Sequence, residues 1–312
     1  VFVFNTNEMR KAFLDTLSES EFEAISVKAA EMFEQKFLKF GEINESLIDY
    51  FIASKNMEKA AAYCEKFASL YLEKSNSHKA IDLLDMGLDL NLILNNSQKV
   101  IDLGMQLIKL LIKAGRLDKA MERVNFLYGF IGEKSVADRI EVQIQHAYIL
   151  YFKNDIVKSD ELSDEALKMA SEIGYIEGDL QAAFVKCKCL ISKGSLEKHH
   201  ALVSHYLEVS KRNNLPLHIA IFENEKGIYF LYNNQFDASI DAFTESLKYY
   251  KEINDEENIV RSYNNFGVIY LDGYGDYIVA RDYFRKAYTK AVNRNYFMNL
   301  SVYLNNLGET YR

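Results

Sequence analysis

Two nearly identical seven-residue stretches stand near the end of this chain. NNFGVIY occupies 264–270 and NNLGETY occupies 305–311, so the copies start 41 positions apart. A period of this size constrains the fold strongly, because each short unit exposes an apolar face that only a neighbouring unit can cover. The repetition therefore predicts an array of stacked units in place of one globular core.

The same pattern continues toward the N-terminus at a nearly constant spacing. Gly227 precedes Gly267 by 40 positions, and two further steps reach Cys187 and Ala147, which are also small. Three residues later, one turn along the same helix face, each copy carries a large apolar or aromatic residue: Leu150, Leu190, Phe230, Tyr270 and Tyr311. A small side chain above a large one predicts a helix that a second helix approaches closely.

A second helix is predicted within each unit. Gly, Asn or Asp follows the first helix where the chain must turn, as in KNDIVKS and NNQFDAS. A second small residue comes next, except that His199 replaces it in one copy; the small ones are Ala120, Ser159, Ser239 and Ala280. The chain has only one proline and is rich in helix-forming residues. We therefore predict an all-α solenoid of antiparallel helix pairs, with Ala147, Cys187, Gly227 and Gly267 buried at equivalent contacts.

The two ends of the array differ from its middle. Near the start, the breaks in the helical pattern lie only about 20 residues apart. This spacing predicts three stacked helices over about 43–54, 57–74 and 77–91. A last helix near 297–311 contains Gly308 and Tyr311 without a second helix to follow it. Solenoids need polar caps, so we expect this end to expose apolar surface or to pack against another copy as a homodimer.

The combination of a small residue, an aromatic residue, a turn and Ala-x-x-x-Phe resembles the tetratricopeptide repeat (TPR) over about residues 43–312. The period is longer than that of the family, which is usually about 34 residues. The tryptophan and the closing proline of the family pattern are also absent. HEAT-like repeats have the longer period but lack this pattern of small residues, so they are the second hypothesis for the fold. The extra residues are expected to lengthen the helices or the loops between pairs.

Residues 1–40 do not follow the repeat. They predict a short strand (VFVF), a helix, and a capping box from Ser18 to Glu21 that opens a second helix. This order resembles the end of the winged-helix segment that precedes TPR-like repeats in STAND-type signal-transduction ATPases. The alternative is an irregular helix pair that caps the first repeat. Either reading gives a 1–40 cap followed by a 41–312 array truncated in its last repeat.

Charge and composition argue against several classes of protein. The net charge of −8 without a basic run argues against direct binding of nucleic acid. No stretch reaches about 18 consecutive apolar residues, which argues against a membrane span. The cysteines, Cys64, Cys187 and Cys189, form neither a disulfide framework nor a zinc spacing. They predict buried thiols in a reducing compartment, and hence a cytoplasmic protein.

No catalytic, cofactor or metal motif is recognisable. GEKS at 132–135 ends like a phosphate-binding loop, but Glu133 and Tyr128 stand where that motif needs glycine. The adjacent His199 and His200 point about 100° apart on a helix and lack a third ligand nearby. We therefore expect that the chain is not an enzyme and that it holds no cofactor and no metal ion. Of the two adjacent histidines, we expect one to be partly packed and the other to be solvated.

What remains is a binding function, and the TPR resemblance implies where the ligand lies. In that family the first helix of each pair lines a concave groove, and the position three residues before the small residue faces it. Here that position holds Asn224, Asn264 and Asn305, whose amides could each donate to and accept from a peptide backbone. Arg261 could bind a carboxylate, and helical spacing places Tyr148 and Tyr232 on the groove side.

These observations predict a protein- or peptide-binding regulatory module with a protein or an extended peptide as its partner. The resemblance further implies the sensor arm of a larger signalling ATPase, with the motor before residue 1 and room for an output domain after residue 312. A structural scaffold or oligomerisation arm without a dedicated ligand is the alternative from another class.

Overall fold

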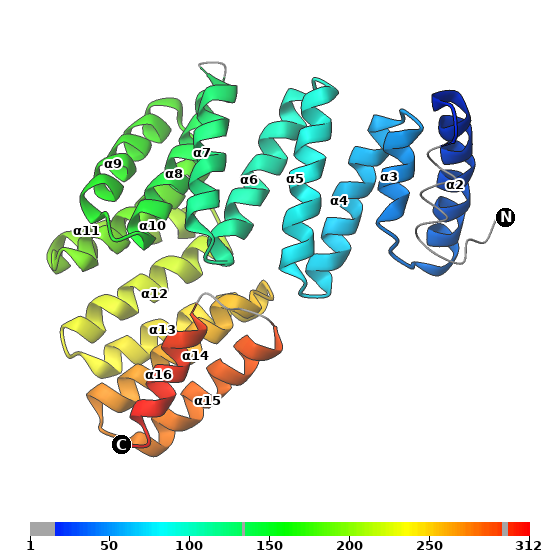
Figure 1. The fold of residues 1–312 in the computed structure, drawn as a ribbon. Helices are drawn as coiled ribbons and strands as arrows, with labels where there is room; N and C mark the ends of the chain where they lie inside the picture. The colour runs from blue at the N-terminus through cyan, green and yellow to red at the C-terminus, as the bar shows by residue number, and fades with distance from the viewer. Residues whose placement is uncertain (1–15, 133–134, 295–298) are drawn as a thin grey trace. The chain divides into compact units, whose positions relative to one another are not determined.

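The computed structural model describes residues 16–132, 135–294 and 299–312, and within these ranges every regular element is a helix. The all-α prediction is confirmed. The chain divides into two compact units, Val1–Leu107 and Ile108–Arg312, and Figure 1 labels the helices of both. The predicted strand at 1–4 and the helix after it lie outside the described residues. The predicted boundary near residue 40 stays a prediction.

The regular elements in the described part of the first unit are all helices. These are α2 (Glu19–Phe40), α3 (Ser46–Ala53), α4 (Met57–Glu73), α5 (Ser77–Ile93) and the beginning of α6 (Ser97–Lys113). The predicted capping box is present, because the Ser18 side chain accepts from the Glu21 N–H while Glu21 accepts from the Ser18 N–H. Aromatic rings pack between α2, α3 and α4. The ring centroids of Phe37 and Phe67 are 5.1 Å apart, and those of Phe51 and Tyr63 are 5.5 Å apart. The three helices predicted after residue 43 are confirmed.

The second unit is the regular part of the array. Its pairs begin with first helices α8 (Val136–Phe152), α10 (Ile176–Ser192), α12 (Pro216–Tyr232), α14 (Glu256–Val268) and α16 (Leu300–Glu309). Their second helices are α9 (Ile156–Ile173), α11 (Leu196–Arg212), α13 (Phe236–Glu252) and α15 (Tyr277–Asn293), while α7 (Leu117–Ile131) precedes the first pair. Helices α10 to α13 each have 17 residues. The long period therefore resides in the helices and not in long loops.

Three-residue turns follow α8, α10, α11, α12 and α13, and the middle residue of each turn adopts a left-handed conformation. Asn154, Gly194, Asn214, Asn234 and Asn254 all have φ between 51° and 67°. The next residue then bonds back across the turn, as the Ser195 N–H does to the Leu190 carbonyl and the Gln235 N–H to the Phe230 carbonyl. Glycine and asparagine tolerate this conformation best, which is why these residues end the helices here.

The predicted burial of the small residues is confirmed. Ala147 and Cys187 are fully buried, and Gly227 and Gly267 are buried as well. A Cβ atom added at Gly227 would lie 2.5 Å from the Phe243 ring, and one at Gly267 would lie 2.5 Å from the Phe284 ring. The Ser239 hydroxyl, at the second small position, donates to the Gly227 carbonyl at 2.8 Å. The repeated code therefore specifies contacts between the first and second helix of a pair.

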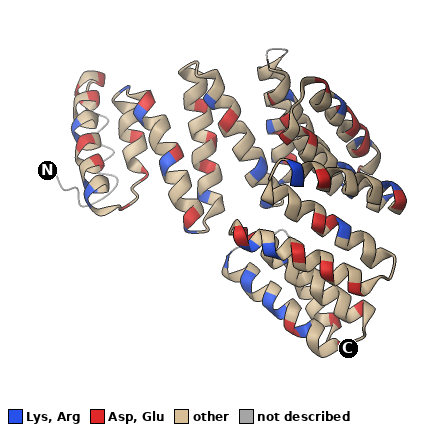
Figure 2. Ribbon diagram, turned by 180° about the vertical axis from the view of Figure 1, so that it is seen from behind, with Lys and Arg blue, Asp and Glu red and all other residues tan. Residues whose placement is uncertain are grey.

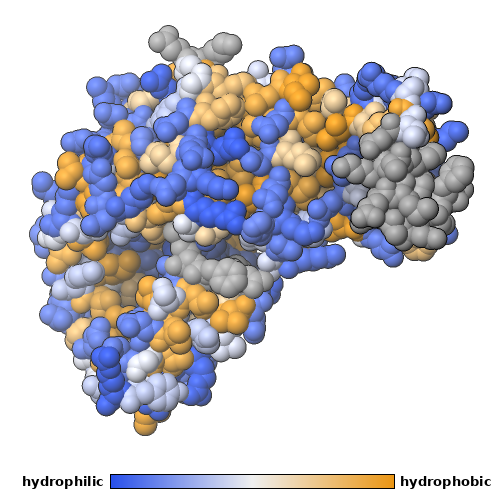
Figure 3. All heavy atoms as spheres, in the orientation of Figure 1, coloured by the Kyte–Doolittle hydropathy of each residue, from blue (hydrophilic) through white to orange (hydrophobic). Residues whose placement is uncertain are grey.

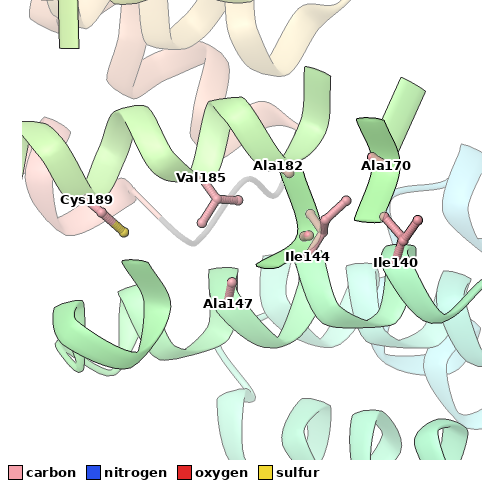
Figure 4. Close-up of a cluster of buried hydrophobic side chains, with 8 residues drawn as sticks. Ile140, Ile144, Ala147, Ala170, Ala182, Val185 and Cys189 are labelled. Carbon is pink, nitrogen blue, oxygen red and sulfur yellow. The ribbon is translucent and has the colours of Figure 1, made fainter. Parts of the chain in front are cut away.

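The core of the second unit consists of several clusters of buried side chains, which lie within and between the helix pairs. Between α8, α9 and α10 it contains small and branched side chains, shown in Figure 4: Ile140, Ile144, Ala147, Ala166, Ala170, Ala182, Val185 and Cys189. Cys189 donates to the Ser159 hydroxyl at 3.2 Å, and Ser159 donates to the Ala147 carbonyl at 2.7 Å. These bonds satisfy polar groups that burial would otherwise leave unpaired. The three cysteines are free and buried, as expected.

A short π-helix explains why the final two copies are spaced one position further apart than the copies before them. Helix α14 continues into the π-helical segment η1 (Ile269–Gly273) before α15 begins. A π turn accommodates one additional residue without breaking the helix. Gly273 makes this possible, since a Cβ atom there would lie 2.7 Å from the Phe236 ring of α13. The packing code of the next pair is thereby kept in register.

The last helix has the exposed surface predicted for it. Leu304 and Tyr311 are 53% and 61% exposed, and an added Cβ atom at Gly308 would meet nothing within 4 Å. The contact that buries Gly227 and Gly267 is therefore missing at this position.

Candidate functional site

Two adjoining cavities lie among the first helices of the second unit. The larger has a volume of about 240 Å³ and the smaller about 210 Å³. Tyr148, Phe152, Arg261 and Asn299 line both of them, and we call the two cavities together the groove. In Figure 3 the surface around a recess in this unit mixes hydrophobic and hydrophilic side chains.

Asparagines of neighbouring first helices are linked at the groove. Asn224 lines the larger cavity and Asn264 the smaller one. The Asn265 amide donates to Asn224 Oδ1 at 2.8 Å, and the Asn306 amide donates to Asn264 Oδ1 at 2.9 Å. The second asparagine of each NN pair therefore reaches back to the groove asparagine of the preceding repeat.

This ladder changes what the groove asparagines can offer. We expected each amide both to accept from and to donate to a peptide, but one acceptor position on Oδ1 is already used within the protein. No hydrogen bond to another described residue uses the Nδ2 of Asn224 or Asn264. The ladder thus fixes the two amides with their N–H groups available, which suits a row of carbonyl acceptors.

A buried ion pair occupies the corresponding ladder position one repeat earlier. Glu225, next to Asn224, is fully buried and accepts from Lys188 Nζ on α10 at 2.9 Å. His199 of α11 lies on its other side, with Nε2 3.4 Å from the Glu225 carboxylate. Burial opposes ionisation of Glu225, but the charge of Lys188 and the hydrogen bonds with His199 and Lys188 together outweigh burial and lower the pKa of Glu225 to about 2. Glu225 therefore holds Lys188 beside the smaller cavity.

The cations of the groove differ in how far they are neutralised. Lys113 is 2.7 Å from Glu257, whereas the nearest contact of Arg261 with Glu257 is 4.0 Å, too long for a hydrogen bond. Lys188 remains cationic, because Glu225 raises its pKa although burial acts in the opposite direction. Burial raises the pKa of Tyr250 and of Tyr303, so both phenols stay neutral.

The structure brings four of the predicted site residues together: Tyr148, Asn224, Arg261 and Asn264 all line the groove. The other two lie elsewhere. Asn305 is exposed on α16 and lines neither cavity. Tyr232 is 58% exposed near the end of α12 and also lines neither.

Sequence reasoning missed Lys188, Glu225 and Glu257. The register of the repeat contained a signal for the first of them, because Lys188 stands 40 positions after Tyr148 and hence in the same column of the repeat. Glu225 likewise shares the column of Asn265. Glu257 forms an ion pair in the groove with Lys113, which lies 144 positions earlier in the sequence. A repeat period does not predict this contact.

The prediction of one partly packed and one solvated histidine is wrong for the second of them, because both histidines are packed. His199 is buried beside Glu225, and His200 stacks on Tyr229 at 4.1 Å between ring centroids. Across the described ranges, no group of three or more His, Cys, Asp or Glu side chains is arranged to hold a metal ion. In the same part of the chain, no helix combines the length and apolar character that crossing a membrane requires. Figure 2 shows acidic and basic residues interspersed along most of the described helices, whereas on α15 several basic residues follow one another.

Comparison with known proteins supports the fold. No family profile matches the chain, and no curated protein sequence does. Among solved structures, the apo form of RapI is 11% identical with a TM-score of 0.62, over 86% of this chain and 97% of that one. A STAND protein with a tetratricopeptide repeat sensor from Pyrococcus horikoshii is 11% identical with a TM-score of 0.55, over 96% of this chain and 47% of that one.

A third structure, of a Rap protein complexed with competence and sporulation factor, is 11% identical with a TM-score of 0.53 over 97% of this chain and 79% of that one. At these identities the likeness concerns the fold alone. The chain therefore has a TPR-like superhelical fold, as its repeated small residues predict.

Proposed function

We propose that this chain is a protein- or peptide-binding regulatory module of a larger intracellular signalling protein, and that an extended peptide binds in the groove. The observation that carries the proposal is the pair of groove asparagines, Asn224 and Asn264, held one repeat apart with their Nδ2 groups available. A peptide backbone presents carbonyl groups at regular intervals, and amide donors bind them without reading side chains.

The walls of the groove suit the remainder of such a ligand. Tyr148, Phe152 and Phe184 provide aromatic surface, and Arg261 with Lys113, Asp255 and Glu257 provides charges of both signs. Pockets with mostly apolar walls and a few placed polar groups are typical of ligand sites.

The role within a larger protein rests on the structural neighbours. One is a STAND protein with a tetratricopeptide repeat sensor, and another is a Rap protein in complex with competence and sporulation factor. We infer a comparable role here, in which occupancy of the groove is reported to an attached domain. In this proposal the module has no catalytic activity of its own.

The first test is a binding experiment on the whole chain with random octapeptides displayed on phage. Selected peptides are titrated against wild type and against Asn224→Ala/Asn264→Ala. Loss of a net hydrogen bond costs about 0.5–1.5 kcal/mol, so two losses should weaken binding roughly ten- to a hundredfold. Circular dichroism checks that helicity is kept.

Alanine also removes the acceptor of Asn265 and Asn306, so a second variant separates binding from the ladder. Asn224→Asp/Asn264→Asp keeps an oxygen for the ladder and removes the free N–H groups, and it should weaken the same peptides comparably. Asn305→Ala and Tyr232→Ala serve as comparisons outside the cavities. Unchanged affinity in both double variants, with the fold intact, would remove the groove from the mechanism and favour a structural scaffold.

A further inference from the structure

The smaller cavity carries positive charge although the chain as a whole is negative. Its lining includes Lys188 and Arg261 but no Asp or Glu among the described residues. The larger cavity, by contrast, includes Asp255 and Glu257 beside its cations. The two ends of the groove therefore differ in the charge that they present to a ligand.

Arg261 has bonding capacity that the protein does not use. Its side chain is only 31% exposed, and its nearest described carboxylate, Glu257, is 4.0 Å away and already paired with Lys113 at 2.7 Å. A guanidinium group has five N–H donors in a planar fork. Among the described residues no hydrogen bond from this fork is found, and a largely buried cation whose ion pair is as long as 4.0 Å is unfavourable.

Lys188 and Asn264 add donors on the same cavity. Lys188 is 20% exposed and its ammonium group gives one bond to Glu225, at 2.9 Å, out of the three that it can make. Asn264 lines the same cavity, and its Oδ1 is the atom used by Asn306. Aromatic side chains, among them Tyr151 and Tyr303, form the walls around these polar groups.

We propose that the smaller cavity binds one carboxylate group of the ligand. Arg261 holds it through two parallel N–H···O bonds, and Lys188 and the Asn264 amide supply further donors. The aromatic walls take the apolar side chain next to that carboxylate. This inference rests on the proposed function and gives the peptide a direction, with its carboxylate toward α16 and its remainder in the larger cavity.

The carboxylate could belong to a free C-terminus or to an acidic side chain, and four peptide pools distinguish these sources. Random octapeptides are made with free or amidated C-termini, each with or without Asp and Glu. The whole chain is incubated with each pool, and bound peptides are quantified by mass spectrometry. We expect wild type to retain at least tenfold more peptide from a pool with carboxylates than from the amidated pool that lacks Asp and Glu.

Variants assign this preference to Arg261. Arg261→Gln should abolish the preference while the amidated pool still binds, and Arg261→Lys, which keeps charge but loses the planar fork, should reduce it about tenfold. Arg285→Gln, at an exposed arginine on α15, should change nothing. Circular dichroism shows whether each variant is folded. If Arg261→Gln does not fold, Arg261→Lys alone tests the contribution of Arg261 to the preference.

The outcomes separate this inference from the proposed function. Equal retention of all four pools by wild type would overturn the carboxylate site while leaving peptide binding in place. Retention of none would overturn both. A stronger preference for phosphoserine peptides than for carboxylate peptides, abolished by Arg261→Gln, would assign the cavity to phosphate and overturn the proposal.

Discussion

At the scale of the residue, the absence of a single methyl group decides how closely two helices approach. The rings of Phe243 and Phe284 come within 2.5 Å of the positions that Cβ atoms on Gly227 and Gly267 would take. The rings are fully buried, so they have little room to move aside. Gly308 occupies the same position of the repeat but has nothing packed against it.

This difference predicts opposite results for one substitution at equivalent positions. Gly227→Ala should lower the free energy of unfolding by about 1–3 kcal/mol, because it overpacks the contact with Phe243. Gly308→Ala should leave that free energy unchanged or raise it by up to about 1 kcal/mol, since alanine favours a helix. Urea unfolding followed by circular dichroism measures both.

A compensating change provides the control for this prediction. Gly227→Ala combined with Phe243→Leu should recover part of the lost stability if the ring is the obstacle. Equal effects of alanine at Gly227 and at Gly308 would contradict the packing code.

At the scale of the element, polar side chains tie neighbouring first helices at one repeated position. Asn265 and Asn306 donate backward to Asn224 and Asn264. Glu225, in the same column, reaches back to Lys188 as an ion pair. Buried polar groups of this kind stabilise only when they are paired, so each link also specifies which helices are neighbours.

The Glu225 link predicts a dependence of stability on pH. The pKa of Glu225 is about 2 in the folded protein, below the ordinary value of 4.5. Its stabilising contribution is therefore fully present above pH 4.5 and is lost as the pH falls toward 2. Glu225→Gln should lower the free energy of unfolding by about 3 kcal/mol at neutral pH, and the gap to wild type should narrow between pH 4.5 and 2.

Urea unfolding at a series of pH values measures this gap. The matched control is Glu245→Gln, which removes an exposed pair with Lys248 and should cost less than about 1 kcal/mol at any pH. Parallel curves for wild type and Glu225→Gln would show that the buried pair does not contribute as described.

At the scale of the whole molecule, the second unit is regular from α8 to α15, and apolar side chains on and after α16 are exposed. Each inner pair is covered by the next pair, but Leu304 and Tyr311 remain exposed. Stacked repeats are stabilised by their neighbours, so an uncovered face is a candidate contact between copies of the chain.

We expect the wild-type chain to associate through this face as its concentration rises. Leu304→Glu should shift the equilibrium to the monomer, because a charge at the contact would lose its hydration. Sedimentation velocity over a range of concentrations measures the association. Ile173→Glu, at an exposed apolar residue on α9, is the control and should behave as wild type; a wild type that is monomeric throughout would contradict the expected homodimer.

Local rules and a repeated spacing allowed the sequence by itself to determine the helix pairs, the turns and the buried small residues. A left-handed turn favours Asn or Gly wherever it occurs, and a small residue one turn from a large one favours close helix packing in every copy. The same register placed Tyr148, Asn224, Arg261 and Asn264 on one side of the first helices, and these four meet at the groove.

Only the tertiary structure decided which residues of different repeats meet. In the structure, the Oδ1 atoms of Asn224 and Asn264 accept hydrogen bonds from the next repeat. Lys113 pairs with Glu257, which lies 144 positions later in the sequence. Asn305 and Tyr232 lie outside both cavities. Such contacts depend on the small rotation between successive helix pairs, which accumulates along the stack. A sequence period specifies which face a residue shares, but the accumulated rotation determines what stands opposite that face.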